Sequence, residues 1–468
     1  MTAEAHDVRF VRIAGKFTAV TEDDKQVPTD SVEQVVSQLQ RDATYGTFAD
    51  LPQALKNQMT GDETTFARTV DLQRDGDTNV FKFTIELSEA LFPYGYGGAQ
   101  HLFGVLAGDL FSLTLEGFKI SALSVDEVEY PALTDAIASK GKSDRIAQIR
   151  RAFGLGRYEP LLAFSIKPRV GLTAKALRDI VMSVLGQGFH IAELDTRSVV
   201  HDEAELRELA SLAQDASQKF SAGHIGRFSA NLTAPAHLAV RYAEQIGVGV
   251  APPFVLKVDG GLDGLGAIQA IREKLGTRDA FITCYPLLRE ALAMKDAVRV
   301  PRGTFNDALA ASGADILYPG GRPYLTGTTA RQLGAGEAGA IWGGVRRYRA
   351  IVAERAVMPT VAGGIHAGQL HAYYELLGPD VAYFLGGAIA LHKDGAEQGA
   401  DLCKRVIACA VDLRQAAGTA VTADLPDNLV REIEGSTGGV LSTPYVSPRT
   451  LLKKIGRQQL WYHEPRAK

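Results

Sequence analysis

The sequence predicts a two-part α/β protein in which an N-terminal α+β domain precedes a C-terminal (β/α)8 barrel. From Leu161 onward, short apolar runs alternate with longer helical patterns, and eight such units follow over about 250 residues. Before Leu161, strand and helix patterns do not alternate regularly, which is typical of an α+β domain. Because βα units also build open doubly wound sheets, the count of units favours the barrel without deciding it.

The N-terminal domain, residues 1–150, is expected to hold a small sheet with helices beside it. Asp75-Gly76 separates two strand-like runs and indicates a hairpin. Strands are expected at 10–20, 65–72, 79–87 and 118–125, and helices at 30–41 and 100–111. Residues 130–158 are polar and mixed, so we interpret them as the connection to the barrel, with one short helix near 143–152.

The barrel domain is expected to span residues 151–424, and residues 425–468 form a polar tail that packs on the barrel or on a partner. The expected strands are 161–167, 189–195, 227–233, 253–259, 280–285, 315–319, 360–364 and 382–388. Helical patterns lie between them, for example at 174–185, 202–218, 236–246 and 346–356.

The composition excludes several classes of partner. The 468 residues carry a net charge of -4, which argues against binding to nucleic acid or to an anionic membrane. No apolar window approaches the roughly 18 residues of a spanning helix, and the first residues do not resemble a secretory signal. The odd number of cysteines, without paired spacing, fits a reducing compartment. We therefore expect a cytoplasmic protein that binds a small molecule.

Polar residues gather where the predicted barrel strands end, and barrels bind ligands at that end. The first strand ends in Lys167, and the second in Glu193 and Asp195, which point the same way because they are two residues apart. Later strand ends supply further candidates, which are Asn231, Thr233, Lys257, Asp259, Tyr285 and Tyr318.

Glycine pairs end the seventh and eighth strands, at Gly363-Gly364 and Gly386-Gly387. Such pairs let backbone N–H groups approach an anion, and the loops after these two strands are the usual phosphate site of a barrel. The alternative is that the glycines only make tight turns between strand and helix.

Two further alternatives concern the charged residues. Lys167, next to two carboxylates, could transfer protons or could form a structural ion pair, because burial lowers a lysine pKa while carboxylates raise it. Glu193 and Asp195 could hold a divalent cation through oxygen ligands, or could pair with the neighbouring lysine. His366 and His392, each alone after a strand, are more often structural.

Several motifs together resemble the large subunit of ribulose-1,5-bisphosphate carboxylase/oxygenase (RuBisCO). They are DATYGTF at 42–48, SIKPRVGL at 165–172, NLTA at 231–234, PTVAGGIH at 359–366 and LGGA at 385–388. The resemblance implies a ferredoxin-like N-terminal domain, a C-terminal barrel and a homodimer in which one subunit's N-terminal domain completes the active site of the other.

The chain departs from the carboxylase pattern at the residues that bind carbon dioxide and metal. Counted from Lys167, Glu193 stands where the family has the lysine that forms a carbamate, Asp195 matches a metal aspartate, and Thr196 replaces the metal glutamate. Other positions also differ: Arg169 replaces a second lysine, Tyr285 and Tyr318 two histidines, Pro286 a phosphate-binding arginine, Leu325 the mobile-loop lysine and Ala362 a serine.

The resemblance therefore implies a RuBisCO-like protein of form IV rather than a genuine carboxylase. It implies proton transfer through an enediolate on a small keto-sugar phosphate or keto acid, by an enolase, isomerase or decarboxylase. The catalytic candidates are Lys167, His101, Lys257, Tyr285 and Tyr318, and the substrate-binding candidates are Thr47, Asn231, Gly363, Gly364, Gly386 and Gly387.

The substrate is expected to carry one phosphate or carboxylate, because only one anion site is retained. We expect no cofactor, with Mg²⁺ at Glu193 and Asp195 as the alternative. Tyr285 and Tyr318 could donate hydrogen bonds to an oxyanion or fill the space of a lost phosphate site. The alternative function is a catalytically inactive binding or regulatory homologue.

Overall fold

The chain forms two compact units in a computed structural model. Unit 1 comprises Met1–Ser139, Gly264–Gly266 and Leu287–Ala311, and unit 2 comprises Lys140–Asp263, Ala267–Pro286 and Ser312–Lys468. The structure describes residues 9–20, 27–28, 32–33, 36–37, 67–92, 102, 114–115, 118–167, 172–195, 200, 202–261, 264–276, 279–286, 298–320, 335–362, 365–418, 423–436, 445–449 and 451.

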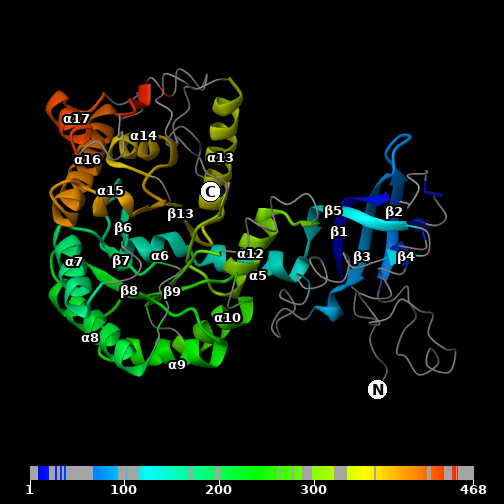
Figure 1. The fold of residues 1–468 in the computed structure, drawn as a ribbon, viewed down its shortest axis with the longest axis horizontal. Coiled ribbons are helices and arrows are strands. Elements are labelled where there is room, and N and C mark those ends of the chain that lie inside the picture. Colours follow the sequence, from blue (N-terminus) through cyan, green and yellow to red (C-terminus); the bar gives the residue numbers. More distant parts are fainter. Residues whose placement is uncertain are drawn as a thin grey trace. The chain divides into compact units, whose positions relative to one another are not determined.

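Unit 1 is built on a six-stranded sheet with the order β11-β5-β1-β3-β2, in which β4 also pairs with β5. Its strands are β1 (Phe10–Val20), β2 (Ala67–Arg74), β3 (Val80–Ser88), β4 (Thr114–Leu115), β5 (Phe118–Glu129) and β11 (Val298–Arg299). A short 3-10 helix, Glu89–Leu91, follows β3. The predicted strands of this domain are confirmed (Figure 1).

Alternating apolar residues explain why β1 and β3 pair. Along β1 the buried side chains include Val11, Ile13 and Phe17, each at an alternate position, so that they share one face of the sheet. Phe17 stacks on Phe81 of β3 with ring centroids 5.5 Å apart. The predicted hairpin is also present: Gly76 has φ +61°, which a residue without Cβ adopts at little cost, and Asp75 N–H donates to Val80 O at 2.8 Å.

Strand β11 is a feature that the sequence did not predict. Its two residues pair in parallel with Leu123 and Ser124 of β5, although more than 170 positions separate them in the chain. Two residues are too few to show an alternating pattern, so nothing in the local sequence marks them as a strand.

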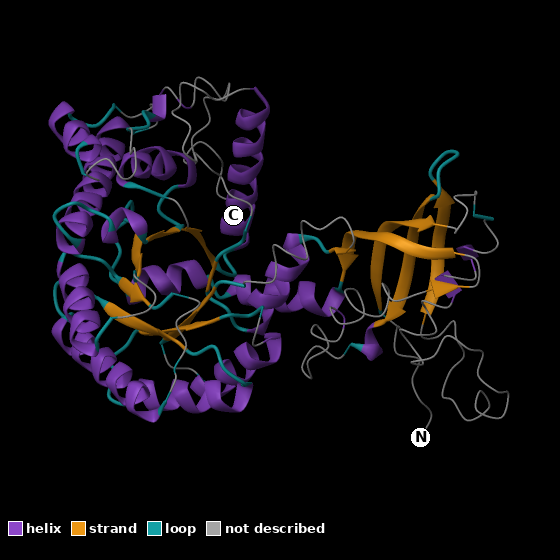
Figure 2. Cartoon of the chain, in the orientation of Figure 1, coloured by secondary structure: helices purple, strands orange, loops and turns teal. Residues whose placement is uncertain are grey.

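Unit 2 contains a closed barrel of eight parallel strands, which decides between the barrel and the open sheet (Figure 2). Around the barrel the order is β10-β12-β13-β14-β6-β7-β8-β9, and β14 closes onto β6 through the pair Ala382 and Leu161. The strands are β6 (Leu161–Ser165), β7 (Ile191–Glu193), β8 (Arg227–Asn231), β9 (Phe254–Val258), β10 (Ala280–Cys284), β12 (Ile316–Leu317), β13 (Met358–Ala362) and β14 (Ala382–Leu385). All eight predicted strands are confirmed.

Helices α7, α8 and α9 run around the outside of the barrel strands (Figure 1). Thr173 caps α7 by accepting from Ala176 N–H, and Asp202 caps α8 by accepting from two backbone N–H groups of its first turn. The helices after the first barrel strand are α7 (Ala174–Gly186), α8 (Glu203–Lys219), α9 (Ala236–Gly247), α10 (Gly264–Leu275), α12 (Arg302–Ser312), α13 (Ala335–Glu354), α14 (Ala367–Leu377), α15 (Gly387–Ala390), α16 (Ala396–Ala417) and α17 (Asp427–Glu434).

The connection before the barrel holds two helices where the sequence predicted one. Helix α6 (Arg145–Ala152) agrees with the prediction, but α5 (Pro131–Lys142) was missed. Among its residues only Leu133 is buried, so the helix lacks the apolar stripe that reveals an amphipathic helix in a sequence. Proline at its first position is compatible with a helix start, because that N–H needs no partner within the helix.

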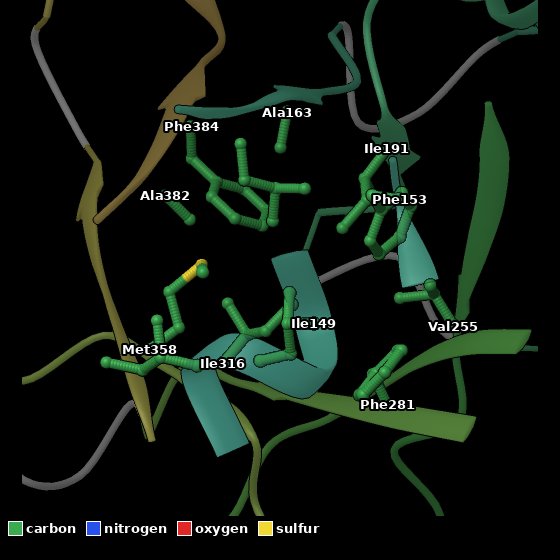
Figure 3. Close-up of a cluster of buried hydrophobic side chains, with 12 residues drawn as sticks. Ile149, Phe153, Ala163, Ile191, Val255, Phe281, Ile316, Met358, Ala382 and Phe384 are labelled. Carbon is green, nitrogen blue, oxygen red and sulfur yellow. The ribbon is translucent and has the colours of Figure 1, made fainter. Parts of the chain in front are cut away.

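Helix α6 closes one end of the barrel interior (Figure 3). Its buried residues Ile146 and Ile149, with Phe153 after it, pack on inward side chains near the strand starts, such as Ile191 and Phe281. Each fully buried side chain of this kind contributes about 1.5–3 kcal/mol. The start of the barrel is therefore filled with apolar groups, and the polar residues lie toward the opposite end.

Helix α14 carries a buried histidine beside the barrel. Every residue of this helix is buried, and His371 Nδ1 lies 2.9 Å from the hydroxyl of Tyr445. That hydroxyl accepts from Leu425 N–H at 3.1 Å and also forms a hydrogen bond with the carboxylate of Asp424. Burial lowers the pKa of His371 to about 4.

Acid is expected to destabilise the protein through this histidine. The ring stays neutral in the folded chain down to about pH 4 but takes a proton near pH 6.5 when unfolded, so stability is complete above that value and falls as the pH drops. The loss at pH 4 is about 3 kcal/mol. Urea unfolding at pH 7.5 and 4.5 measures it, and His371→Gln should remove this residue's share of the dependence, while other buried histidines such as His366 keep theirs. The same change at the exposed His237 should leave the dependence as it is; equal slopes for both variants would contradict this assignment.

No helix in the described parts of the chain is both long enough and apolar enough to cross a membrane.

Candidate active site at the strand ends

Lys167 and Asp195 meet at the carboxyl end of the first two barrel strands. Ser165 and Glu193 are partners in the β6–β7 register, so the residues two positions later project from the same face. The Lys167 ammonium group forms an ion pair with the carboxylate of Asp195. Their side chains remain 29% and 13% exposed, so this pair can be reached from solvent.

A second ion pair lies deeper in the barrel. Lys257 Nζ of β9 donates to Glu193 Oε1 at 2.7 Å, and the hydroxyl of Thr283 in β10 donates to Oε2 of the same carboxylate. The side chains of Lys257 and Glu193 are only 5% and 4% exposed. Each carboxylate oxygen of Glu193 therefore has its own protein donor.

Thr283 is a site residue that the sequence reasoning missed. It lies two positions before the candidate Tyr285, and alternate residues of a strand face the same side. That spacing is the signal that could have placed it in the barrel interior.

Asn231 joins neighbouring strand ends to one another. Its Nδ2 donates to the backbone oxygen of Asp195 at 3.2 Å, and its Oδ1 accepts from the hydroxyl of Thr233 at 2.6 Å. The Thr233 oxygen accepts from Asp259 N–H at 3.2 Å. Because Asn231 is fully buried and contacts protein through both ends of its amide, this geometry favours a role in positioning Asp195.

Tyr285 and Tyr318 stack on each other after strands β10 and β12. Their ring centroids are 4.6 Å apart and their planes differ by 16°. Stacked faces exclude water, which supports the interpretation that the rings fill space in the barrel mouth. Hydrogen bonding from either hydroxyl to an oxyanion stays a prediction.

Gly386 allows β14 to approach the lysine of the first strand. A Cβ on this residue would lie 3.3 Å from Ser165 O and 3.6 Å from Lys167 Cε. Gly387 begins the short helix α15. The other expected anion-binding residues, Gly363, Gly364 and Thr47, lie outside the described residues, as do His101 and Thr196.

The two histidines after strands β13 and β14 have structural surroundings. His366 is the N-cap residue of α14, its backbone N–H donates to Gln369 Oε1 at 3.3 Å, and burial lowers its pKa to about 4. His392 Nδ1 accepts from Asp394 N–H at 3.2 Å. Both placements agree with the structural interpretation of these residues.

The charges of the site do not fit a divalent cation. Among the residues that the structure describes, no cluster of three or more histidine, cysteine, aspartate or glutamate side chains could hold a metal ion. More decisively, Glu193 and Asp195 each have a lysine as ion-pair partner. A Mg²⁺ ion binds through oxygen ligands and would have to displace these ammonium groups.

Comparison with known proteins shows which proteins the chain is similar to. No family model matches it. The chain is 23% identical over 357 residues to the ribulose bisphosphate carboxylase large chain of Xanthobacter autotrophicus, which covers 71% of this chain and 69% of that protein. The chain is therefore similar, at low identity, to RuBisCO large chains.

Solved structures share the RuBisCO fold. A dimeric archaeal Rubisco from Hyperthermus butylicus matches with a TM-score of 0.65 at 17% identity, covering 89% of this chain and 94% of that one. A rubisco-like protein from Burkholderia fungorum matches with a TM-score of 0.60 at 16% identity, covering 87% and 94%. The predicted architecture, a ferredoxin-like domain and a (β/α)8 barrel, is confirmed.

Proposed function

We propose that this chain is a RuBisCO-like enzyme that moves a proton next to the carbonyl of a small keto-sugar phosphate or keto acid, through an enediolate. The reaction is of the enolase, isomerase or decarboxylase type and does not fix carbon dioxide. The observation that carries the proposal is the solvent-accessible pair of Lys167 and Asp195 at the end of the barrel where ligands bind.

The pair contains the groups that proton transfer requires. If one proton passes from Lys167 to Asp195, the result is a neutral amine and a neutral carboxylic acid, with no change in total charge. The amine then accepts the proton from the substrate carbon, and the acid donates a hydrogen bond to the developing enediolate oxygen. Return of the proton to the same or the adjacent carbon completes exchange or isomerisation.

Carbon dioxide fixation does not fit the residue at position 193. A carbamate forms on a primary amine, and Glu193 offers a carboxylate whose oxygens are bonded to Lys257 and Thr283. The resemblance placed the carbamate-forming lysine at this position, so the reaction that depends on that group has no counterpart here.

One anion of the substrate is assigned to the ends of strands seven and eight. Gly386 lies next to the stem of Lys167, and Gly387 follows it at the start of α15, so we assign the anion to backbone N–H groups at this strand end. The resemblance adds Gly363, Gly364 and Thr47 to this site.

We assign the protein a homodimeric state with the active site at the subunit interface. The resemblance supports this assignment, and one similar structure is described as a dimeric Rubisco. His101 of the partner subunit would then supply a second acid or base. Sedimentation at the monomer mass would contradict it.

Solvent exchange distinguishes the enzyme from an inactive binding homologue. The purified protein is incubated in deuterium oxide with a panel of phosphorylated ketoses and keto acids, with and without Mg²⁺, and the substrates are analysed by NMR. Deuterium at the carbon next to the carbonyl, independent of Mg²⁺, is the expected result. Tight binding of a panel member without exchange would favour the binding homologue instead.

A further inference from the structure

The buried cluster of Glu193, Lys257 and Thr283 lies one layer below the pair that faces solvent. Lys257 and Thr283 are partners in the β9–β10 register, and Glu193 reaches them from β7. Glu193 also precedes Asp195 by two positions, so the two carboxylates belong to successive layers on the same face of the barrel.

Each of the two ion pairs is neutral on its own, and Asp259, two positions after Lys257, adds a further buried carboxylate near them. Glu193 and Asp195 supply two negative charges, and Lys257 and Lys167 supply two positive charges. A divalent cation added to these two ion pairs would give the four groups an excess of two positive charges. Alternatively it would expel both ammonium groups, which breaks a buried ion pair and is strongly unfavourable.

The two hydrogen-bond donors to the Glu193 carboxylate are held in fixed positions. Lys257 approaches one oxygen and Thr283 the other, from two adjacent strands whose backbones are held by the barrel hydrogen bonds. A tethered ammonium group thus occupies the place next to the carboxylate that a metal ion would need.

We propose that Lys257 replaces a divalent cation in this barrel, so that the site is built to work without metal. Lys257 is a positioning residue: it neutralises Glu193, holds the end of β7, and thereby fixes Asp195 against Lys167. This inference deepens the proposed function and rests on it for its catalytic meaning, but its test uses no substrate.

Manganese binding tests the inference directly. Mn²⁺ is titrated into the purified wild-type protein and into Lys257→Met, and free Mn²⁺ is followed by electron paramagnetic resonance. The wild-type chain should show no stoichiometric site. Lys257→Met frees the carboxylate of Glu193 and should bind Mn²⁺ more tightly than wild type by about tenfold or more. Lys175→Met, which removes an 85% exposed partner of Asp179, is the matched control and should behave as wild type.

A second variant covers the case in which Lys257→Met does not fold. Lys257→Gln keeps a hydrogen-bond donor near Glu193 but removes the charge, so it should fold and gain the same Mn²⁺ site. Adding Glu193→Gln to either variant should abolish the gain. In thermal melts, Mn²⁺ should raise the Tm of the Lys257 variants and leave the wild-type Tm unchanged.

Two results would overturn the inference. One is a stoichiometric Mn²⁺ site in the wild-type chain that Asp195→Asn removes. The other is a folded Lys257 variant whose Mn²⁺ affinity equals that of wild type. A failure of the proposed function can be told apart from a failure of this inference. In the first case deuterium exchange on the substrates is absent, but the Mn²⁺ binding results are as predicted.

Discussion

Replacing Lys167 by methionine is expected to lower solvent deuterium exchange on the substrate by about 10²–10⁴-fold, the usual contribution of a positioned acid or base. Methionine keeps the length and volume of the side chain but cannot carry a proton. Asp195 then loses its ion-pair partner and the site loses the amine. The rate is measured by NMR in deuterium oxide, on the best substrate of the panel.

The stability of this variant separates chemistry from folding. Because the pair is only partly exposed, its removal should cost more than the roughly 1 kcal/mol of a surface pair and less than the roughly 3–5 kcal/mol of a fully buried one. Lys175→Met serves as the control for a lysine ion pair far more exposed than this one. If Lys167→Met folds normally and exchanges as fast as that control, Lys167 is not the acid or base.

Asp315→Asn is expected to cause the largest loss of stability, about 3–5 kcal/mol, because it leaves buried cations without their counter-charge. Asp315 is 1% exposed and follows α12 at the start of β12. Its carboxylate pairs with Arg272, with Arg145 at 2.7 Å and with Lys140 at 3.4 Å.

The pKa values of Asp315 and Lys140 reflect the opposing effects of burial and of the neighbouring charges. Burial alone would raise the pKa of Asp315, but the three cations outweigh it and hold that pKa well below its usual range. Burial also lowers the pKa of Lys140 to about 8, against the opposing effect of Asp315. Removing the carboxylate would lower the pKa of Lys140 further, so that this group can lose its proton, but the guanidinium groups of Arg145 and Arg272 keep their charges without a counter-charge.

Unfolding in guanidinium chloride measures the loss of unfolding free energy in Asp315→Asn. Asp179→Asn is the matched control, because Asp179 is 59% exposed and pairs with a single lysine, so it should cost about 1 kcal/mol or less. Equal midpoints for the two variants would contradict the structural role of Asp315.

The barrel could be predicted because its signal is local. Each strand is a short apolar run with buried side chains on both faces, and the helices between them carry caps such as Thr173 and Asp202. The predicted runs are longer than the hydrogen-bonded strands, since residues such as Lys167 and Asp195 lie beyond the last ladder bond. Those extra residues form the part of the site that faces solvent.

The pairing of Asp195 with Lys167 was one of the alternatives that the sequence left open, but the pairing of Glu193 with Lys257 was not predicted, because it depends on the stagger of separate strands. The sequence placed Glu193 and Asp195 together as one possible metal site. In the structure each has its own lysine, and Lys257 reaches the deeper of the two. The alternation of residues along a strand predicts which face of the sheet a side chain occupies. It does not predict the layer of the barrel in which that side chain contacts residues of other strands. Strand β11 was missed for a different reason, since its two residues are too few to show an alternating pattern.

The most direct test of the account is a single incubation in deuterium oxide with ¹³C-labelled bicarbonate. The protein, stripped of metal, is mixed with the panel of keto-sugar phosphates and keto acids and analysed by NMR. The account predicts deuterium at the carbon next to the carbonyl of at least one compound, and no ¹³C in any new carboxyl group. A ¹³C-labelled carboxyl product, or no deuterium in any compound that binds, would contradict it.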